Sequence, residues 1–388
     1  MTPGRVKVLT AVAALVVAGS GGPASARNTT HYRVTELGSL GGANSGANSI
    51  NDRGLVSGWA NLAGDSTRHA TVWSGRLAVD LGTLGGANSS IVWPVKNVGG
   101  RVVGISQTAT PDPWHEQWSC VDFFPAGAVT GNTCRGFVAD GNTMRALPTL
   151  GGNNGFAAGA NDLGQITGWA ETQLHDPTCR GRDQVLQFLP VIYGPGRDQI
   201  RPLPLVRGDS SGAATAINDH GQAVGISGDC DQAEGRLTAR HAVLWSRGRV
   251  IKLGALGAGW WNTPMAINER GDVVGFAGDP SDSTGGITHA FIWTRLHGMR
   301  PLIPGDANST AYGINNKGQV VGTTCAADGT NCHGFVWQNG ELTNLNGAAQ
   351  TGYAGNITVA TDINDAGVIT GRAVEPYGKV AIVATPIR

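Results

Sequence analysis

Charged residues are scarce in this sequence. Asp, Glu, Lys and Arg make up 14% of the chain, against about 25% in an average globular domain. The 28 basic residues balance the 28 acidic residues, and no basic stripe is visible along the chain. A surface that binds nucleic acid needs a basic patch or stripe, so the composition argues against a nucleic-acid partner.

Several motifs of known chemistry are also missing. The sequence has no G-x-S-x-G elbow, no H-E-x-x-H motif and no phosphate-binding loop, which are signatures of hydrolases, zinc proteases and nucleotide-binding proteins. None of the six cysteines forms a C-x-x-C pair, a spacing that is typical of zinc sites. We therefore expect no metal site built from the cysteines.

Long apolar runs are confined to the first 26 residues. Arg5 and Lys7 come before or at the edge of an apolar run at 8–18, which is short for a bilayer span, and Ala-Ser-Ala at 24–26 forms an A-x-A cleavage site. We interpret 1–26 as a secretory signal peptide, with an uncleaved anchor as the alternative. The sequence thus predicts a secreted, extracellular protein with no transmembrane segment after signal cleavage.

Glycine, by contrast, is abundant: there are 60 glycines, about twice the usual share. Many belong to a repeated phrase, I-N-x-x-G-x-V-x-G. The first glycine of each copy follows that of the preceding copy by 46 to 64 residues. Five clear and two degenerate copies begin at 50–54, 96–100, 160–164, 217–221, 267–271, 314–318 and 363–367. Self-similarity at this period predicts a solenoid, a propeller or an array.

Each period is expected to form four strands. In the fourth copy, strand A is ATAIN, and the N-D-x-G turn leads into strand B, QAVGIS, because Asn, Asp and Gly suit tight turns. After a longer loop come strand C, HAVLW at 241–245, and strand D, RVIKLG at 249–254. Strand C is apolar on consecutive positions, so both of its faces should be buried, as in stacked propeller blades.

The two ends of the chain favour a closed ring. The seventh copy has strands A, B and C but no D, whereas the N-terminal HYRVTELGSLGG resembles a D strand with its following loop. We therefore predict an all-β, seven-bladed β-propeller in which 31–40 pairs with 378–387. Closure of this kind removes exposed sheet edges. A single domain over 27–388 would have blade cores near 43–85, 89–150, 156–206, 212–256, 263–303, 309–346 and 358–388, the last completed by 31–40.

The repeated phrases LGTLGG, AIN-x-x-G-x-VVG and HAF-x-W resemble those of the secreted bacterial HAF-repeat proteins, with His-Ala-Phe at 289–291. The resemblance covers 31–388. It implies a secreted repeat protein and no particular activity.

The propeller arrangement also predicts how the cysteines pair. Cys120 and Cys134 fall in the B–C loop of blade 2, and Cys325 and Cys332 in that of blade 6. The remaining two fall in the B–C loops of neighbouring blades 3 and 4. We expect disulfides 120–134, 325–332 and 179–230, formed in an oxidising compartment.

A binding site is most plausible on the face formed by the long B–C and D–A loops, since variable loops on a rigid scaffold usually carry function. The candidate binding residues there are aromatic or imidazole side chains: Trp114, His115, Trp118, Trp260 and Trp261. Trp offers a flat apolar face and an N–H donor to a sugar ring or a peptide. The alternative is that these side chains pack their own loops.

Recurring side chains are interpreted as structural. We expect the Trp residues that end strand C, at 73, 245, 293 and 337, to form blade cores, and Trp59 and Trp169 to pack as well. We also expect His69, His241, His289 and His333 to make structural hydrogen bonds. The repeated Asn residues should satisfy turn backbone groups. His115 and His175 are loop residues that do not recur, and either could act in acid–base chemistry.

The sequence leaves three functions open, of which a structural envelope protein with no defined ligand is the third. The first is a non-catalytic binding scaffold, expected to be a monomer, for an extracellular glycan or protein. The second is a hydrolase or lyase acting on extracellular polysaccharide, with carboxylates such as Asp112, Glu116 and Asp122 at the channel mouth. No cofactor is expected; the acidic stretches 228–234 and 278–286 could hold calcium.

Overall fold

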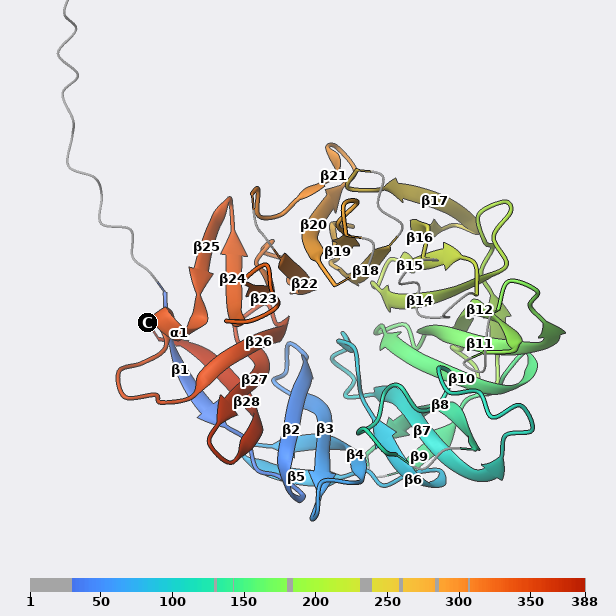
Figure 1. Ribbon diagram of the computed structural model, residues 1–388, viewed down its shortest axis with the longest axis horizontal. Helices are drawn as coiled ribbons and strands as arrows, with labels where there is room; N and C mark the ends of the chain where they lie inside the picture. Colours follow the sequence, from blue (N-terminus) through green and yellow to red (C-terminus); the bar gives the residue numbers. More distant parts are fainter. Residues whose placement is uncertain are drawn as a thin grey trace, which may run out of the picture.

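The computed structural model describes residues 30–387, apart from 129–130, 142, 180–183, 231–238, 258–260, 283–285 and 306–307. The chain forms seven four-stranded antiparallel sheets around a central channel (Figure 1). The prediction of a seven-bladed β-propeller is confirmed. The predicted signal peptide, 1–26, lies outside the described residues.

Every blade has the strand order A-B-C-D from the channel outward. The inner A strands are β2 (Gly41–Ile50), β6 (Gly85–Ser90), β10 (Gly151–Ala160), β14 (Ser211–Ile217), β18 (Asn262–Ile267), β22 (Asn308–Ile314) and β26 (Asn356–Ile363). The B strands are β3 (Val56–Leu62), β7 (Val102–Pro111), β11 (Ile166–His175), β15 (Ala223–Gly228), β19 (Val273–Gly278), β23 (Val320–Cys325) and β27 (Ile369–Glu375).

The C strands are β4 (Arg68–Ser74), β8 (Asn132–Asp140), β12 (Leu186–Tyr193), β16 (His241–Ser246), β20 (Thr288–Thr294), β24 (His333–Gln338) and β28 (Gly378–Ile387). The outer D strands are β5 (Leu77–Asp80), β9 (Thr143–Ala146), β13 (Ile200–Pro202), β17 (Arg249–Gly254), β21 (Gly298–Pro301), β25 (Glu341–Asn344) and β1 (His31–Glu36). One short helix, α1 (Leu345–Ala348), follows β25. In the described part of the chain, no helix has the length and apolar character needed to cross a membrane.

The two glycines of the repeated phrase have different structural roles. The first, as in Gly54, has a positive φ of 82° in the turn between strands A and B, a conformation that favours glycine. The second, as in Gly58, lies against strand A, where an added Cβ would overlap the carbonyl oxygen of Gly46. The other six blades repeat both features. The phrase therefore encodes a tight turn followed by close contact between strands.

The repeated asparagine links neighbouring blades. The Asn51 Oδ1 atom accepts hydrogen bonds from the backbone N–H groups of Arg53 and Leu55, which confirms the predicted turn role. Its Nδ2 atom donates to the backbone oxygen of Asn97 in the next blade, at 2.8 Å. Five other blades make the same link to their neighbour, at 2.9–3.2 Å, and Asn364 returns to Asn51. Blades 2 and 3 are linked instead by a hydrogen bond from the Val98 N–H to the Asp162 carboxylate.

The ring closes as predicted. Strand β1 pairs antiparallel with β28, from His31 opposite Ile387 to Glu36 opposite Ile382. Tyr32 and Val34 on β1 are buried, with exposed fractions of 2% and 8%, in a cluster with the rest of blade 7.

All three predicted disulfides are present, namely Cys120–Cys134, Cys179–Cys230 and Cys325–Cys332. The second joins the loops of blades 3 and 4. Three disulfides are compatible with an extracellular protein.

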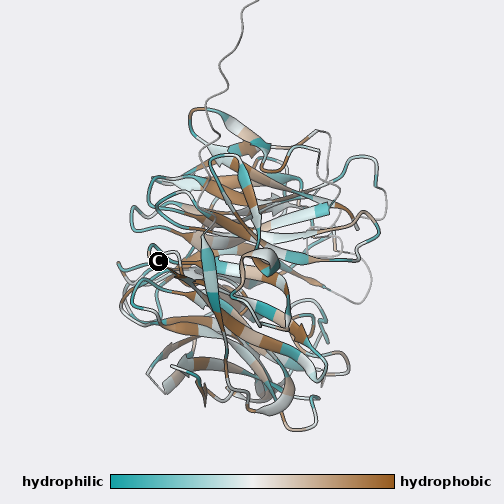
Figure 2. Ribbon diagram, turned by 90° about the vertical axis from the view of Figure 1, so that its left-hand side faces the viewer, coloured by the Kyte–Doolittle hydropathy of each residue, from teal (hydrophilic) through white to brown (hydrophobic). Residues whose placement is uncertain are grey.

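The apolar residues lie along the strands inside the disc, and the turns are more polar (Figure 2). The strand C tryptophans belong to the blade cores as predicted: Trp73 and Trp245 are buried, and Trp293 and Trp337 pack against core clusters. Their indole N–H groups find backbone partners where the ring is most buried, as from Trp73 to the oxygen of Gly38, at 2.8 Å.

Candidate functional site

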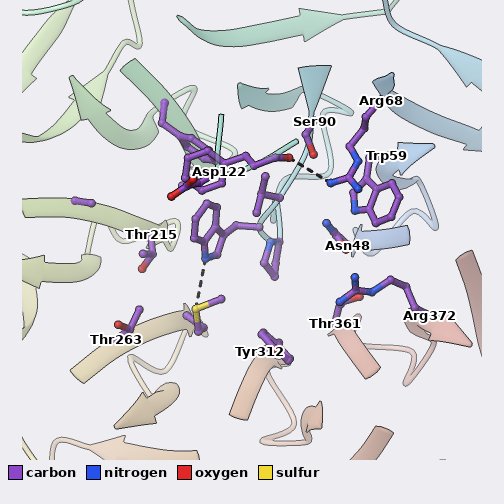
Figure 3. Close-up of a pocket in the computed structure, with 18 of the residues that line it drawn as sticks. Asn48, Trp59, Arg68, Ser90, Asp122, Thr215, Thr263, Tyr312, Thr361 and Arg372 are labelled. Atoms are coloured by element: carbon purple, nitrogen blue, oxygen red, sulfur yellow. Dashed lines mark hydrogen bonds between the residues drawn. The ribbon is translucent and has the colours of Figure 1, made fainter. Parts of the chain in front are cut away.

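A cavity of about 730 Å³ occupies the channel on the side of the B–C and D–A loops. The cavity wall includes one strand A residue or its equivalent from every blade, always three positions before the repeated asparagine. These seven residues are Asn48, Pro94, Ala158, Thr215, Met265, Tyr312 and Thr361. They comprise six residue types, with threonine twice, so a sevenfold backbone encloses a site with no sevenfold symmetry (Figure 3).

Aromatic rings form one side of the cavity. Trp93 follows the short strand β6 and reaches across the channel, where its Nε1 atom lies 3.4 Å from the sulfur of Met265 in blade 5. Its ring packs edge-on against Phe156, with centroids 4.9 Å apart. Trp118, from the B–C loop of blade 2, stacks on Trp169 at 4.8 Å. All of these rings line the cavity.

Cationic side chains gather at the opposite side, in blades 7 and 1. Arg68 begins β4, and its guanidinium lies 3.6 Å from the centroid of the Trp59 ring. Arg372 projects from β27, and Figure 3 shows both arginines directed into the cavity. Lys379, an exposed residue of β28, completes the group.

Two carboxylates line the cavity in the described part of the chain, and neither pairs with these cations. Asp65 accepts hydrogen bonds from the backbone N–H groups of Ala43 and Asn44 and from the Asn61 amide. The hydrogen bond from the Ala43 N–H is the largest of the effects that lower the pKa of Asp65. Asp122 is exposed at the rim. Asp65 therefore serves as an ionised acceptor for its own loop.

Several polar atoms in the wall have no hydrogen-bond partner among the described residues. These atoms are Ser90 Oγ, Trp261 Nε1, Thr263 Oγ1 and Arg372 Nε. Ser90 and Thr263 are buried, with exposed fractions of 1% and 8%. Buried polar groups are normally hydrogen-bonded, so this cavity presents donors and acceptors that a ligand could satisfy.

Of the five predicted binding residues, two line the cavity, two lie outside it, and one is not among the described residues. Trp118 and Trp261 line the cavity, with Trp261 packed edge-on against Phe276 at 5.1 Å. Trp114 is 44% exposed and packs against His175 outside the cavity. His115 is exposed and does not line the cavity either. Trp260 lies outside the described residues.

Comparisons with known proteins give only a distant architectural likeness. No protein-family model matches the sequence, and no curated relative matches it. Among solved structures, a putative gluconolactonase is 12% identical with a TM-score of 0.28, covering 50% of this chain and 69% of that one. The acylaminoacyl peptidase of Pyrococcus horikoshii is 10% identical, with a TM-score of 0.44, covering 91% and 52%.

The sialidase of Trypanosoma rangeli is 11% identical, with a TM-score of 0.39, covering 80% of this chain and 56% of that one. This chain therefore spans about half the length of the peptidase and the sialidase. Its seven blades are established by its own strand pairing.

The cavity residues that sequence reasoning missed can be found by comparing the blades position by position. Arg372 stands five residues after its turn glycine. At the same position the other blades have Trp59, Ile105, Trp169, Ile226, Phe276 and Thr323. An arginine at a position that is mostly apolar is a signal visible in the sequence. Trp59 and Trp169 are buried, as the packing interpretation predicted, and they also line the cavity.

The repeated histidines make structural contacts. His69 bonds to Asp80, His241 to Asp209 and His289 to Asp279, at 2.8–2.9 Å, while the His333 Nδ1 atom lies 3.3 Å from the backbone oxygen of Asn331.

The acidic stretches suggested for calcium are partly described. Asp229 pairs with Arg240. The Asp279 carboxylate is held by His289 and Ser281, and the hydrogen bond from His289 contributes most to lowering its pKa to about 2. Calcium binding there stays a prediction.

The carboxylates proposed for catalysis do not gather in the cavity. Asp112 and Glu116 are buried, at 1% and 2% exposed, beneath the B–C loop of blade 2 and away from the cavity wall. There they meet Glu171, and all three accept hydrogen bonds from the Nδ2 atom of Asn154. Of the three suggested residues, only Asp122 lines the cavity. The loop has no counterpart in the other blades, so its inward path was not visible in the repeat.

Burial raises the pKa of both glutamates in this cluster. Glu171 accepts additional hydrogen bonds from Ser119 and Gln184, and Glu116 Oε1 accepts from the backbone N–H groups of Val185 and Leu186. Burial, followed by the charge of Glu171, raises the pKa of Glu116 to about 8.

We expect the Glu116→Gln variant to flatten the dependence of stability on pH. The folded pKa of Glu116 exceeds its unfolded value, so its stabilising contribution is complete below the unfolded pKa and is lost as pH rises through about 8. Between pH 6 and 8 the wild type should lose about 2 kcal/mol more than the variant. Urea unfolding at both pH values measures this difference, with Asp122→Asn, in the same loop, as the control. Equal losses in the wild type and Glu116→Gln would show that Glu116 is already ionised.

Proposed function

We propose that this protein is a secreted binding module that holds part of an extracellular glycan in the channel cavity. The observation that carries the proposal is a cavity with aromatic rings on one side and unpartnered polar atoms in its wall. A sugar ring has an apolar face and a rim of hydroxyl groups, which match aromatic faces and hydrogen-bonding atoms respectively.

The size of the cavity favours a small ligand over a protein surface. Small-molecule sites usually measure about 300–1,000 Å³, and about 730 Å³ falls inside this range. A stable protein partner buries at least about 1,200 Å² over a broad surface. A protein could still enter through one protruding segment, but the enclosed wall fits a glycan end better.

Hydrolysis or lyase chemistry is the alternative function. Catalysis by two carboxyl groups needs them about 5–10 Å apart across the substrate. The carboxyl groups in the described wall are those of Asp65, which accepts backbone hydrogen bonds from Ala43 and Asn44, and of Asp122 at the rim. This arrangement favours binding over catalysis.

A glycan array with the purified protein tests the proposal. We expect Trp261→Ala to weaken binding to the captured glycan at least about tenfold, since it removes both a ring and an N–H group. Trp114→Ala is the matched control, because Trp114 lies on the same face but outside the cavity.

No captured glycan, or equal loss of binding in both variants, would reject the proposed site. Incubating the same glycans with the protein and measuring new reducing ends tests the catalytic alternative.

A further inference from the structure

Two arginines in the cavity have no counter-ion among the described residues. Arg68 donates to the Asn61 side chain and to the backbone oxygen of Phe123, each at 3.3 Å, and both acceptors are neutral. The Arg372 side chain makes no hydrogen bond to the other described residues, and its Nε atom is buried. By contrast, Arg240, which occupies in blade 4 the position of Arg68, pairs with Asp229. The cavity arginines therefore differ from their counterpart Arg240, which has a carboxylate partner.

The two guanidinium groups also act on one another. Burial and then the positive charge of Arg372 lower the pKa of Arg68 to about 10, and burial lowers the pKa of Arg372. Both groups stay charged at neutral pH. Two half-buried cations in one cavity destabilise the empty protein, and an anion between them would relieve both effects.

Arg68 is held in position before any ligand arrives. Arg68 lies on the face of Trp59, an arrangement that is favourable for a cation. Gly46 leaves the space for Arg372 beside the Trp59 ring, because a Cβ there would lie 2.9 Å from both Arg372 Cδ and Trp59 Cε2. Preorganised guanidinium groups bind carboxylates and similar oxyanions through paired hydrogen bonds.

We propose that the glycan is acidic, and that Arg68 and Arg372 together bind its anionic group, a carboxylate or a sulfate. Lys379 at the rim adds a third positive charge. The aromatic side of the cavity and the hydroxyl groups of Ser90 and Thr263 would contact the rest of the sugar. This inference rests on the proposed function and narrows it to one class of glycan.

Calorimetry with oligouronates and their methyl esters tests the charge alone, since the ester keeps the ring and removes the anion. Hydrogen bonds to a charged group contribute about 1.5–3 kcal/mol, so the free acid should bind about 10- to 100-fold more tightly than the ester. A second comparison uses a neutral oligosaccharide with and without an added sulfate group. Tighter binding of the uronate assigns the carboxylate, and tighter binding of the sulfated sugar assigns the sulfate.

Two variants locate the effect. Arg372→Ile installs the residue that blade 4 carries at this position, so the fold should tolerate it, and melting without ligand checks that. It should abolish the preference for the acid over the ester. Arg68→Met should reduce the preference at least about tenfold, whereas Arg240→Met, the matched control outside the cavity, should leave it unchanged.

The failures are distinguishable. If the acid binds no more tightly than its ester, and the sulfated sugar no more tightly than its unsulfated form, the glycan site stands and the anionic assignment is wrong. If Arg372→Ile keeps the full preference, the anion lies elsewhere and the assignment is also wrong. If no oligosaccharide binds, neutral or acidic, the proposed function itself is rejected.

Discussion

A chain that lacks His31–Glu36 is expected to lose its stable folded state. Strand β1 supplies the outer strand of blade 7 and buries Tyr32 and Val34. Burying two side chains of this kind contributes about 3–6 kcal/mol, which is comparable with the total stability of many domains. The deletion also exposes the edge of β28, which favours aggregation. Thermal melting and size-exclusion chromatography measure the two effects.

A synthetic peptide of residues 30–40 provides the control for this deletion. Added in trans, it should restore the melting temperature of the shortened chain, because an extended peptide can pair with an exposed strand edge. The same peptide with Val34→Asp should not restore it, since residue 34 is buried. A shortened chain that melts like the full-length protein would show that closure by β1 is dispensable.

Breaking the ion pair between Lys96 and Asp362 is the second change with a large expected effect. The Lys96 Nζ atom lies 2.6 Å from the Asp362 carboxylate, which is fully buried, and Asp362 also accepts a bond from the Ile50 N–H. Removing one partner of a buried pair typically costs about 3–5 kcal/mol. We expect this loss for Lys96→Ile, which leaves a buried carboxylate without its cation; burial already raises the pKa of Asp362.

The double variant Lys96→Ile/Asp362→Ala should recover most of the lost stability. In blades 4 and 5 the corresponding positions carry Ile217 with Ala216, and Ile267 with Ala266, so the double variant restores the apolar repeat. Replacing both partners of a buried pair is often neutral. The unfolding free energies of the wild type, the two single variants and the double variant form a double-mutant cycle. If the double variant lost the sum of the two single losses, the pair would not be coupled.

The exposed pair Arg101–Asp140 gives a matched reference, because its side chains are 34% and 70% exposed. A surface pair of this kind should show a coupling energy below about 1 kcal/mol. A comparable coupling in both cycles would mean that burial has no part in the effect.

The features that could be predicted from the sequence are those that repeat in every blade and those that follow from closing the blades into a ring. The Asn-x-x-Gly turn could be inferred from one blade and checked in six others, because each copy faces the same steric demands. The incomplete seventh copy and the unpaired first strand fixed the closure. Once the blades were ordered, Cys179 and Cys230 were neighbours, although 51 residues separate them.

The site was less predictable because it depends on departures from the repeat. Arg68 and Arg372 belong to the first and last blades, and their meeting requires both closure and the missing side chain of Gly46. Trp93 reaches the cavity because blade 2 interrupts its inner strand after Ser90. Trp118 was selected for its loop, but its partners in blade 3 could not be inferred from that loop alone.

The position of the two arginines has a consequence for the protein as a whole. Blade 7 contains both ends of the described chain, and it meets blade 1 where Arg372 approaches Arg68. A ligand that bridges these arginines spans the seam of the circle, so it binds the closed form and not an opened one. Occupancy therefore stabilises closure by mass action, and the same linkage makes affinity sensitive to any damage at the terminal strands.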